Sequence, residues 1–471
     1  MELETQETRP TPSLLSSVWE AIRGTEQDFT TGSLGRAILL LSIPMVLEMS
    51  MESLFAIVDV FFVAKLGAHA AATVGLTEAM MTIVYSVALG LSMATTAMVA
   101  RRIGEKKPER AAEAAVQAIW LGFASSAVIA VFGILFARQL LGLMGADAEV
   151  IREGWAYTAI IFAGVFAVML LFLINAIFRG AGDATMAMRV LWLANGINIV
   201  LDPCLIFGLG PFPELGLKGA ALATTIGRSI GVVFQVWLLL GGRGRVRVRR
   251  KDLRVAWGVM GRLARVSLSG MGQFIISHVA WVGLVRIVAD FGSVALAGYT
   301  IAIRVVVVAI LPAWGMANAA ATLVGQNLGA KQPERAEKSV WTTGLYNMVF
   351  LGLVGVAFVV FAEPIIRIFT SDPQVIVHGV DCLRYVSYGY LFYAWGMVMV
   401  QAFNGAGDTV TPMMINIFCF WMWQIPLAYF LATQTVLGPR GVYLAIAIAE
   451  GTVALVAVLV FRRGKWKQQA I

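Results

Sequence analysis

Charged residues are scarce in this sequence. They make up only 14% of the 471 residues, whereas 59% of the residues are hydrophobic. A soluble protein of this size has no way to hide so much apolar surface from water, but a lipid bilayer solvates such surface directly. The shortage of charge therefore excludes an ordinary soluble protein and indicates an integral membrane protein.

Cysteine and histidine are also rare. The three cysteines (Cys204, Cys382 and Cys419) lie in or beside apolar stretches without metal-type spacing, so we expect packing roles and no disulfide framework. The three histidines are far apart and form no HExxH or similar motif. No His/Cys/Asp cluster or nucleophile motif supports a membrane enzyme, and no cofactor is expected.

The few charges are distributed unevenly. The net charge is +8, and the basic residues concentrate in short hydrophilic breaks at 101–110, 243–254 and 462–467, while the break at 208–217 has almost none. This is the positive-inside pattern of a multispanning protein rather than the footprint of a nucleic-acid partner. It predicts a multi-pass protein of the cell membrane with both termini in the cytoplasm. The N-terminal 30 residues carry more acid than base, unlike a signal peptide, and we expect an interfacial helix around residues 14–22.

Long apolar runs are abundant. Twelve candidate spans follow from runs of about 20 apolar residues, and Pro44 gives the first of them a cause for a bend. The predicted organisation is all-α: a cytoplasmic tail (1–36), a first lobe of six helices (37–241), a basic cytoplasmic linker (242–256), a second lobe of six helices (257–463) and a basic tail (464–471). The twelve spans are 37–64, 72–100, 112–137, 152–178, 186–208, 219–240, 258–289, 295–325, 339–362, 378–403, 412–432 and 440–461.

Two sequence motifs each occur twice. IGEKKPER at 103–110 recurs as LGAKQPER at 328–335, and FRGAGD at 178–183 recurs as FNGAGD at 403–408, both at an offset of 225 residues. Because each half holds an even number of spans, the halves are predicted to be parallel repeats about an axis along the membrane normal, which suits alternating access. The GAGD segments read as tight turns, with Asp183 and Asp408 capping the next helix.

The first span carries three acids, Glu48, Glu52 and Asp59. A charged side chain near the bilayer centre costs roughly 2.5–3.5 kcal/mol on insertion scales, so each one needs a reason. At 100° per residue the three fall within a stripe about 40° wide. We expect this face to line a cavity, although packing or snorkelling is the alternative for any single acid.

Two later spans add polar groups at a spacing of four. Asn198 and Asp202 stack on one helix face, as do Ala220 and Thr224 on the next. Carboxylates, an amide, a hydroxyl and a carbonyl together suit a hard monovalent cation, or a proton held on an acid. The alternatives are an interhelical hydrogen-bond clamp for Asn198 and Asp202, and ordinary small-residue packing for Ala220 and Thr224.

Weaker candidates lie in the second half. Gln273 and His278 could line a path, or could each be satisfied by a neighbouring helix, and Glu450 has no explanation. The aromatic run 385–395, which includes Tyr393, could form an adaptable binding wall together with the Met-rich spans. The only basic residue that we place well inside a span is Arg304.

Taken together, the chain resembles the multidrug and toxic compound extrusion (MATE) family over nearly its whole length. The resemblance rests on Pro44, Val58-Asp59, Lys65-Leu66-Gly67, the paired GAGD loops, Asn198-x-x-x-Asp202, Gly219-Ala220-Ala221 and Ala223-Thr224. It implies a V-shaped carrier that exports amphipathic, often cationic compounds in exchange for Na⁺ or H⁺. It also implies an N-lobe cation site at Asp59, Asn198, Asp202, Ala220 and Thr224, assisted by Tyr157 and Asn175 as in the DinF-like branch.

The chain departs from NorM-like members. Their further carboxylates fall at Ser277 and Tyr393 here, which argues against a C-lobe cation site of that type. Glu48 and Glu52 go beyond the acids expected of the family and could add a protonation step or contact a substrate. The 225-residue shift carries Asp59 to Leu284 and Asp202 to Leu427, so we place the coupling in residues 37–240.

The leading hypothesis is a monomeric secondary antiporter for an amphipathic small molecule, working in the bilayer without a nucleic-acid partner. The alternative is a flippase for lipid-linked glycans or lipids from the same wider superfamily, which would need a larger and more basic cavity. A channel is disfavoured because the two halves differ in their polar residues and contain no filter-like repeat.

Overall fold

The computed structural model describes residues 14–24, 27–242 and 244–471, and every regular element in these residues is a helix. The all-α fold class is therefore confirmed. The helix expected around residues 14–22 is present as α1 (Leu14–Arg23). Residues 1–13 and 25–26 of the expected N-terminal tail lie outside the described residues.

Two bundles follow one another along the chain, and we call them the N-lobe and the C-lobe. The N-lobe consists of α2 (Leu34–Ala64), α3 (Ala68–Gly104), α4 (Pro108–Leu135), α5 (Ala137–Leu143), α6 (Ala148–Ala163), α7 (Val165–Ala181), α8 (Ala184–Phe207) and α9 (Leu217–Gly241). The C-lobe consists of α10 (Trp257–Ala289), α11 (Ser293–Gly329), α12 (Pro333–Val360), α13 (Ala362–Arg367), α14 (Pro373–Tyr388), α15 (Tyr390–Ala406), α16 (Val410–Asn416), the π-helix η2 (Ile417–Gln424), α17 (Ile425–Thr433) and α18 (Pro439–Arg462). Two short 3₁₀ turns, η1 (Arg250–Leu253) and η3 (Lys465–Gln468), lie in the linker and the C-terminal tail.

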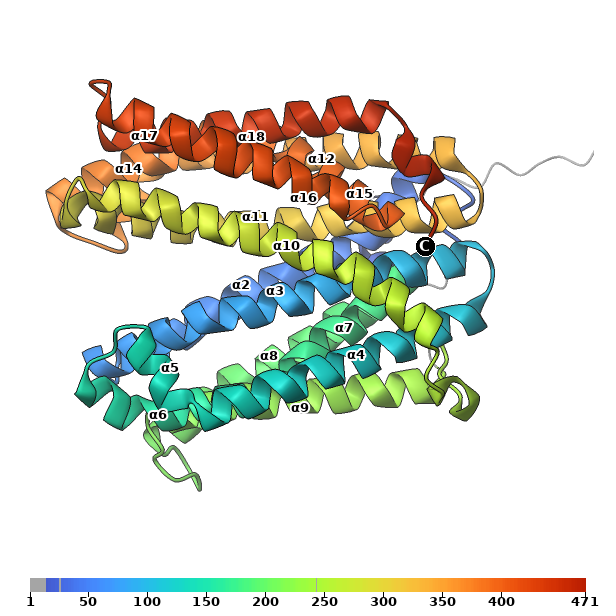
Figure 1. Cartoon of the computed structure of the whole chain (residues 1–471), viewed down its shortest axis with the longest axis horizontal. Helices are drawn as coiled ribbons and strands as arrows, with labels where there is room; N and C mark the ends of the chain where they lie inside the picture. The colour runs from blue at the N-terminus through green and yellow to red at the C-terminus, as the bar shows by residue number, and fades with distance from the viewer. Residues whose placement is uncertain (1–13, 25–26, 243) are drawn as a thin grey trace, which may run out of the picture.

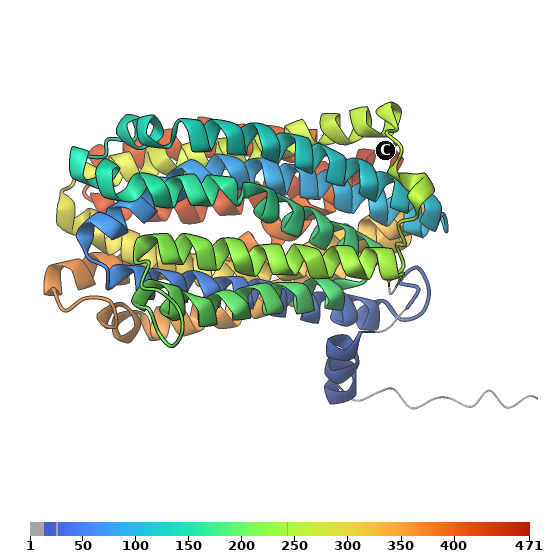
Figure 2. The same ribbon diagram turned by 90° about the horizontal axis from the view of Figure 1, so that it is seen from below.

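The two lobes splay apart at one end and meet at the end where the C-terminus lies (Figure 1). Viewed from below, the long helices run side by side along the long axis, and α1 projects from the bundle (Figure 2). Two helices connect the lobes, because α2 packs on α11 of the C-lobe as well as on α8, and α10 packs on α3 of the N-lobe. The V shape implied by the sequence resemblance is thus the arrangement found.

Within the described residues, ten helical stretches are long and apolar enough to cross a membrane. The two other spans expected from the sequence are α2, which carries Arg36 and three acids, and the pair α14 and α15. Large apolar side chains on the bundle surface, such as Leu135, Val233 and Leu353, are each more than 60% exposed. Such surface is stable against lipid acyl chains, so the all-helical membrane fold is confirmed.

The duplication extends to helix breaks and turns. Gly164 separates α6 from α7, and Gly389 separates α14 from α15 at the same 225-residue offset. Gly182 and Gly407 adopt the left-handed region (φ 90° and 88°) just after α7 and α15, as the GAGD turns require. By contrast, α2 continues as one helix through Pro44.

The aspartates of the two GAGD segments make different contacts. Asp408 accepts the backbone N–H of Thr411 at 3.1 Å and so caps α16, as predicted. Asp183 makes no such bond to α8, and its carboxylate instead accepts the backbone N–H of Arg245 at 2.8 Å. The capping prediction for Asp183 is wrong because the linker between the lobes folds back over this turn and takes the carboxylate.

The basic linker docks on the N-lobe. Arg249 and Lys251 each donate to Glu109 at the start of α4 at 3.1 Å. The hydrogen bond from Lys251 and the two positive charges hold the pKa of Glu109 below its usual value. Farther along α4, Gln117 donates to the carbonyl of Arg254 at 2.9 Å. These contacts therefore hold the linker against α4 of the N-lobe.

The lobes touch closely where they meet. A Cβ atom at Gly104 would overlap the carbonyl oxygen of Gln326, and one at Gly329 would overlap that of Arg101. These two contacts are related by the 225-residue offset, so α3 and α11 cross symmetrically through two glycines. Thr322 also donates to the carbonyl of Arg179 at 3.0 Å, which ties α11 to α7.

Candidate cation site and substrate cavity

Three of the predicted site residues form one buried cluster between α8 and α9. Asn198 lies between Asp202, one helical turn away on α8, and Thr224 on α9. In the amide orientation that satisfies both neighbours, Asn198 Nδ2 donates to Asp202 Oδ2 at 2.9 Å and Asn198 Oδ1 accepts from Thr224 Oγ1 at 3.1 Å. Asn198 and Asp202 are buried. We call these three residues the oxygen cluster.

The remaining predicted members surround the oxygen cluster. Asp59 of α2 lies within Coulombic range of Asp202, and in the described part of the chain no side chain donates a hydrogen bond to it. Ala220 is buried one turn before Thr224 and belongs to the same apolar cluster as Tyr157. Tyr157 is itself within Coulombic range of Asp59 and Asp202. A carboxylate pair, an amide and a hydroxyl are thus gathered as the chemistry of a hard monovalent cation requires.

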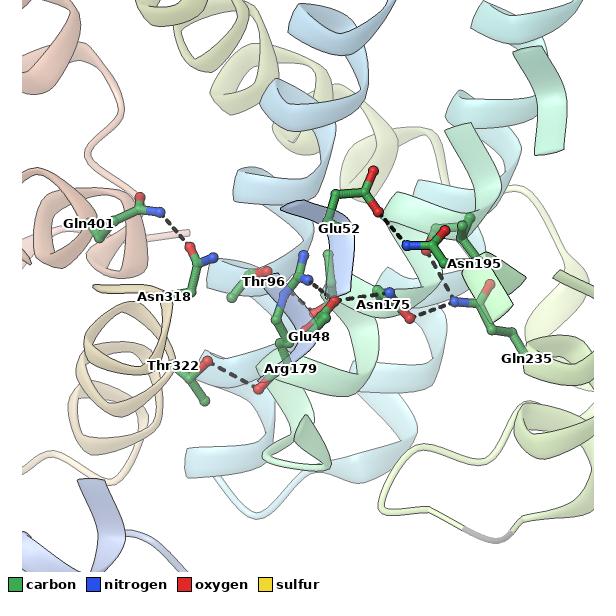
Figure 3. A network of polar contacts seen from close by, with 12 residues as sticks. Glu48, Glu52, Thr96, Asn175, Arg179, Asn195, Gln235, Asn318, Thr322 and Gln401 are labelled. Carbon is green, nitrogen blue, oxygen red and sulfur yellow. Dashed lines mark hydrogen bonds and ion pairs between the residues drawn. The ribbon is translucent and has the colours of Figure 1, made fainter. Parts of the chain in front are cut away.

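Glu48 takes part in a different network, deeper in the N-lobe. Its side chain is 1% exposed and pairs with Arg179 of α7 at 2.7 Å. Asn175 Nδ2 donates to Glu48 at 3.0 Å, and Gln235 of α9 donates to the Asn175 oxygen at 2.7 Å. Figure 3 shows these side chains converging from α2, α7 and α9. The structure therefore places Asn175 in this network rather than in the oxygen cluster.

Glu52, one turn farther along α2, has its own arginine. It accepts from Arg228 of α9 at 3.2 Å. It also accepts from Asn195 of α8 at 2.9 Å, the contact drawn in Figure 3. Arg228 is only 3% exposed, and the rings of Phe55 and Phe172 flank its guanidinium at 5.4 and 6.0 Å. Of the three acids on the predicted stripe, two are therefore neutralised by ion pairs, whereas Asp59 forms no ion pair with any described residue.

Sequence reasoning missed both arginines. The expectation that Arg304 is the only basic residue well inside a span is wrong, because Arg228 lies in the middle of α9 and is almost fully buried. Arg304 is exposed instead. A signal for Arg228 was present in the sequence, since it follows Thr224 at a spacing of four and so shares its helix face.

A cavity of about 630 Å³ lies mostly within the C-lobe. Residues of α10, α11, α14, α15, α16, η2 and α18 line it, and Leu89 and Met93 of α3 complete it from the N-lobe. The lining includes the three predicted cavity residues Gln273, His278 and Tyr393. Its walls are aromatic as well, and Phe274 stacks on Trp314 with the ring centroids 5.6 Å apart.

Glu450 of α18, which the sequence left unexplained, lines this cavity. It is within Coulombic range of Tyr393, and no described side chain forms a hydrogen bond or ion pair with it. Among the described residues that line the cavity there is no lysine or arginine. A single carboxylate in an apolar, aromatic enclosure suits an organic cation, whose charge it pairs and whose apolar parts the rings cover.

A family model described as MatE matches residues 44–204 and 273–430, about two thirds of the chain. The chain belongs to the MatE family. The family resemblance stated from the sequence is confirmed, and membership places the chain among membrane transporters rather than enzymes.

Individual relatives cover nearly all of this MatE protein. The probable multidrug resistance protein NorM of Thermotoga maritima is 26% identical over 436 residues, which are 93% of this chain and 94% of that protein. The FAD transporter of Shewanella oneidensis is 26% identical over 88% of this chain and 92% of its own length. A solved structure of a multidrug resistance MATE family transporter in an outward-facing conformation is 28% identical, with a TM-score of 0.88 over 94% of this chain and 98% of that one.

The two lobes of this MatE transporter repeat one contact with different chemistry. Shifting Glu48 and Arg179 by 225 residues gives Gln273 and Asn404, and these also touch, with Gln273 Nε2 donating to Asn404 Oδ1 at 3.0 Å. The N-lobe thus holds a buried ion pair where the C-lobe holds a neutral pair of amides. The position is structural in both lobes, and only one lobe carries charge there.

This comparison leads to a prediction about stability. Glu48→Gln leaves the buried Arg179 without its carboxylate, which we expect to destabilise the N-lobe by about 3–5 kcal/mol. The double variant Glu48→Gln/Arg179→Asn copies the C-lobe pair and should recover most of that loss. Thermal unfolding in detergent measures both. Arg367→Gln, which removes an exposed ion pair with Glu363, is the control and should change little. A double variant no more stable than Glu48→Gln would contradict the prediction.

Proposed function

We propose that this MatE transporter is a secondary antiporter that exports amphipathic, cationic compounds in exchange for Na⁺ or H⁺ bound in the N-lobe. The observation that carries the proposal is the separation of two sites. The oxygen cluster and Asp59 lie in the N-lobe, whereas the large aromatic cavity with Glu450 lies in the C-lobe. Two sites in two lobes that move against each other are what exchange of unlike solutes requires.

The coupling step follows from electrostatics. Asp59 and Asp202 repel each other across a site with little solvent, and a bound cation or proton relieves that repulsion. Relief is largest when the carboxylates are close and buried, so the ion stabilises the conformation that brings α2 against α8. An ion shifts the equilibrium between conformations only through such a difference in affinity.

The orientation of the chain is part of the proposal. The basic linker, the basic C-terminal tail and the repeated basic loops all lie at the end where the lobes meet (Figure 1). The positive-inside rule places that end in the cytoplasm. The splayed end then faces outward, and the conformation seen here is the one that releases a substrate.

Branch, assembly state and the flippase alternative can be addressed from the same residues. Ser277 and Tyr393 stand where NorM-like members have carboxylates, and the cavity contains both, so we favour the DinF-like branch. A single chain holds both sites, which supports a monomer. The cavity lining has no lysine or arginine among the described residues, so an anionic lipid headgroup would find no partner, which supports export over lipid flipping.

Transport in proteoliposomes tests the proposal. The purified protein is reconstituted and export of a fluorescent organic cation is followed with a Na⁺ gradient and a pH gradient imposed separately. One of the two gradients should drive export, and dissipating that gradient should stop it. Export that responds to neither gradient would rule out the antiport function.

The cavity makes a further prediction. Glu450→Gln should lower the apparent affinity for a cationic dye by about 10- to 150-fold, because one charge-assisted contact worth about 1.5–3 kcal/mol is lost. Affinity for an uncharged analogue of similar size should stay within about twofold. Concentration dependence of transport gives both values, and Glu363→Gln on the exposed surface serves as the control. Equal weakening for both compounds would mean that Glu450 does not pair with the substrate charge.

A further inference from the structure

Arg228 is buried with more donors than partners. Its Nη2 donates to Glu52 at 3.2 Å, while Nε and Nη1 are buried and have no hydrogen-bond partner among the described residues. A buried guanidinium with unmatched N–H groups is expensive to keep, and the two flanking phenylalanine rings compensate only part of that cost. The Arg228 side chain therefore bonds one described carboxylate, that of Glu52, although its remaining N–H groups could bond a second.

A second carboxylate is near. Arg228 lies within Coulombic range of Asp59, and Tyr85 of α3 is the other titratable group that interacts with it besides Glu52. Glu52 and Asp59 are seven residues apart on α2, which is two turns on the same face. On α9, Arg228 follows Thr224 of the oxygen cluster by one turn. The arginine thus lies beside the cation site, near one acid that it holds and one acid to which no described side chain donates a hydrogen bond.

Resting on the proposed function, we infer that Arg228 is a tethered counter-cation that competes with the coupling ion for the carboxylate of Asp59. When the ion occupies the site, the guanidinium bonds Glu52 alone. When the ion leaves, the guanidinium also bonds Asp59 through its free N–H groups, so a positive charge faces Asp59 in both states. The strength of the Glu52 contact then sets the affinity for the ion. Arg228 is a positioning residue in this scheme, because it acts through Asp59.

Glu52 and Arg228 should act in opposite directions. Glu52→Gln frees the guanidinium to compete, so the ion concentration for half-maximal export should rise by about tenfold. Arg228→Gln removes the competitor, and that concentration should fall by about tenfold. In the double variant the Glu52→Gln effect should vanish, because it needs the arginine. Each variant is measured in proteoliposomes with Na⁺ and with pH varied separately.

Controls separate this role from a purely structural one. Arg286→Gln removes an exposed arginine of α10 that pairs with Asp290, and it should leave the half-maximal concentration unchanged. Arg228→Lys keeps the charge and should stay nearer the wild-type value than Arg228→Gln does. Loss of maximal rate or thermal stability with an unchanged half-maximal concentration in both single variants would overturn the inference. If Arg228→Gln fails to fold, an unchanged value for Glu52→Gln has the same meaning.

Failure of this inference differs from failure of the proposed function. If no gradient drives export by the wild-type protein, the antiport function itself fails. If a gradient does drive export but Glu52→Gln and Arg228→Gln shift the ion dependence in the same direction, or not at all, only the role of Arg228 is refuted.

Discussion

Asp202→Asn should abolish gradient-driven export by this MatE transporter while leaving substrate binding intact. Asp202 is fully buried and belongs to the oxygen cluster. Removing one partner of a buried charge contact costs about 2–5 kcal/mol, which weakens ion binding by roughly 30-fold or more. The asparagine is of equal size and can still hydrogen-bond Asn198, so the fold should survive. Export rates under an imposed gradient, compared with equilibrium binding of the fluorescent cation, measure the effect.

A matched control is Asp290→Asn, which removes an exposed aspartate at the end of α10 and should export at the wild-type rate. Asp59→Asn should resemble Asp202→Asn, since the two carboxylates lie within Coulombic range of each other. Normal export by Asp202→Asn under either gradient would sink the assignment of the coupling site. An equal loss of substrate binding would show that Asp202 stabilises the fold rather than binds the ion.

Gly104→Leu should shift the conformational equilibrium away from the state described here. A Cβ atom at Gly104 already overlaps the carbonyl oxygen of Gln326, so a leucine can be accommodated only if α3 and α11 separate where the lobes meet. Overpacking of this kind costs about 1–3 kcal/mol, equal to a shift of roughly 5- to 150-fold in the ratio of the two states. Gly329→Leu should act in the same way, because its contact with Arg101 is the repeat-related one.

Distances between spin labels at Leu143 and Ile368 report this change. Both residues are exposed and occupy equivalent positions in the two lobes, Leu143 as the last residue of α5 and Ile368 directly after α13. In a background without the three cysteines, the distance should shorten in Gly104→Leu as the splayed ends approach. Gly75→Leu on the same helix is the control, because no atom lies within 4 Å of the Cβ position there. An unchanged distribution of spin-label distances in Gly104→Leu, or an equal shift in Gly75→Leu, would show that the contact at Gly104 does not control how far the lobes splay.

Much of the fold was predictable because helices repeat locally. Apolar runs of sufficient length located the spans, and the 225-residue repeat predicted two lobes with the same breaks, as Gly164 and Gly389 show. Positive-φ glycines in the GAGD segments followed from turn chemistry. The prediction that Asp183 caps α8 failed because Arg245 of the linker, 62 residues away in the sequence, donates to its carboxylate. Rules based on local sequence cannot anticipate such a distant partner.

The pair Asn198 and Asp202 of the oxygen cluster was predictable for the same reason, and the arginine pairs were not. Asn198 and Asp202 are four residues apart, so helix geometry alone brings them together. Glu48 and Arg179 are 131 residues apart, and Glu52 and Arg228 are 176 apart. Whether such residues meet depends on how α2 crosses α7 and α9, which periodicity does not specify.

By itself the sequence determined the membrane environment, the long apolar helices, the duplication and a polar face on each of α2, α8 and α9. These depend on composition and on spacings of a few residues, and a helix converts such spacings into faces wherever it lies. The tertiary structure decided that two of the three acids on α2 are neutralised by arginines, that Asp59 is left beside the oxygen cluster, and that Glu450 faces a cavity in the other lobe. These features depend on which helix faces meet, and only the packing of the lobes fixes that.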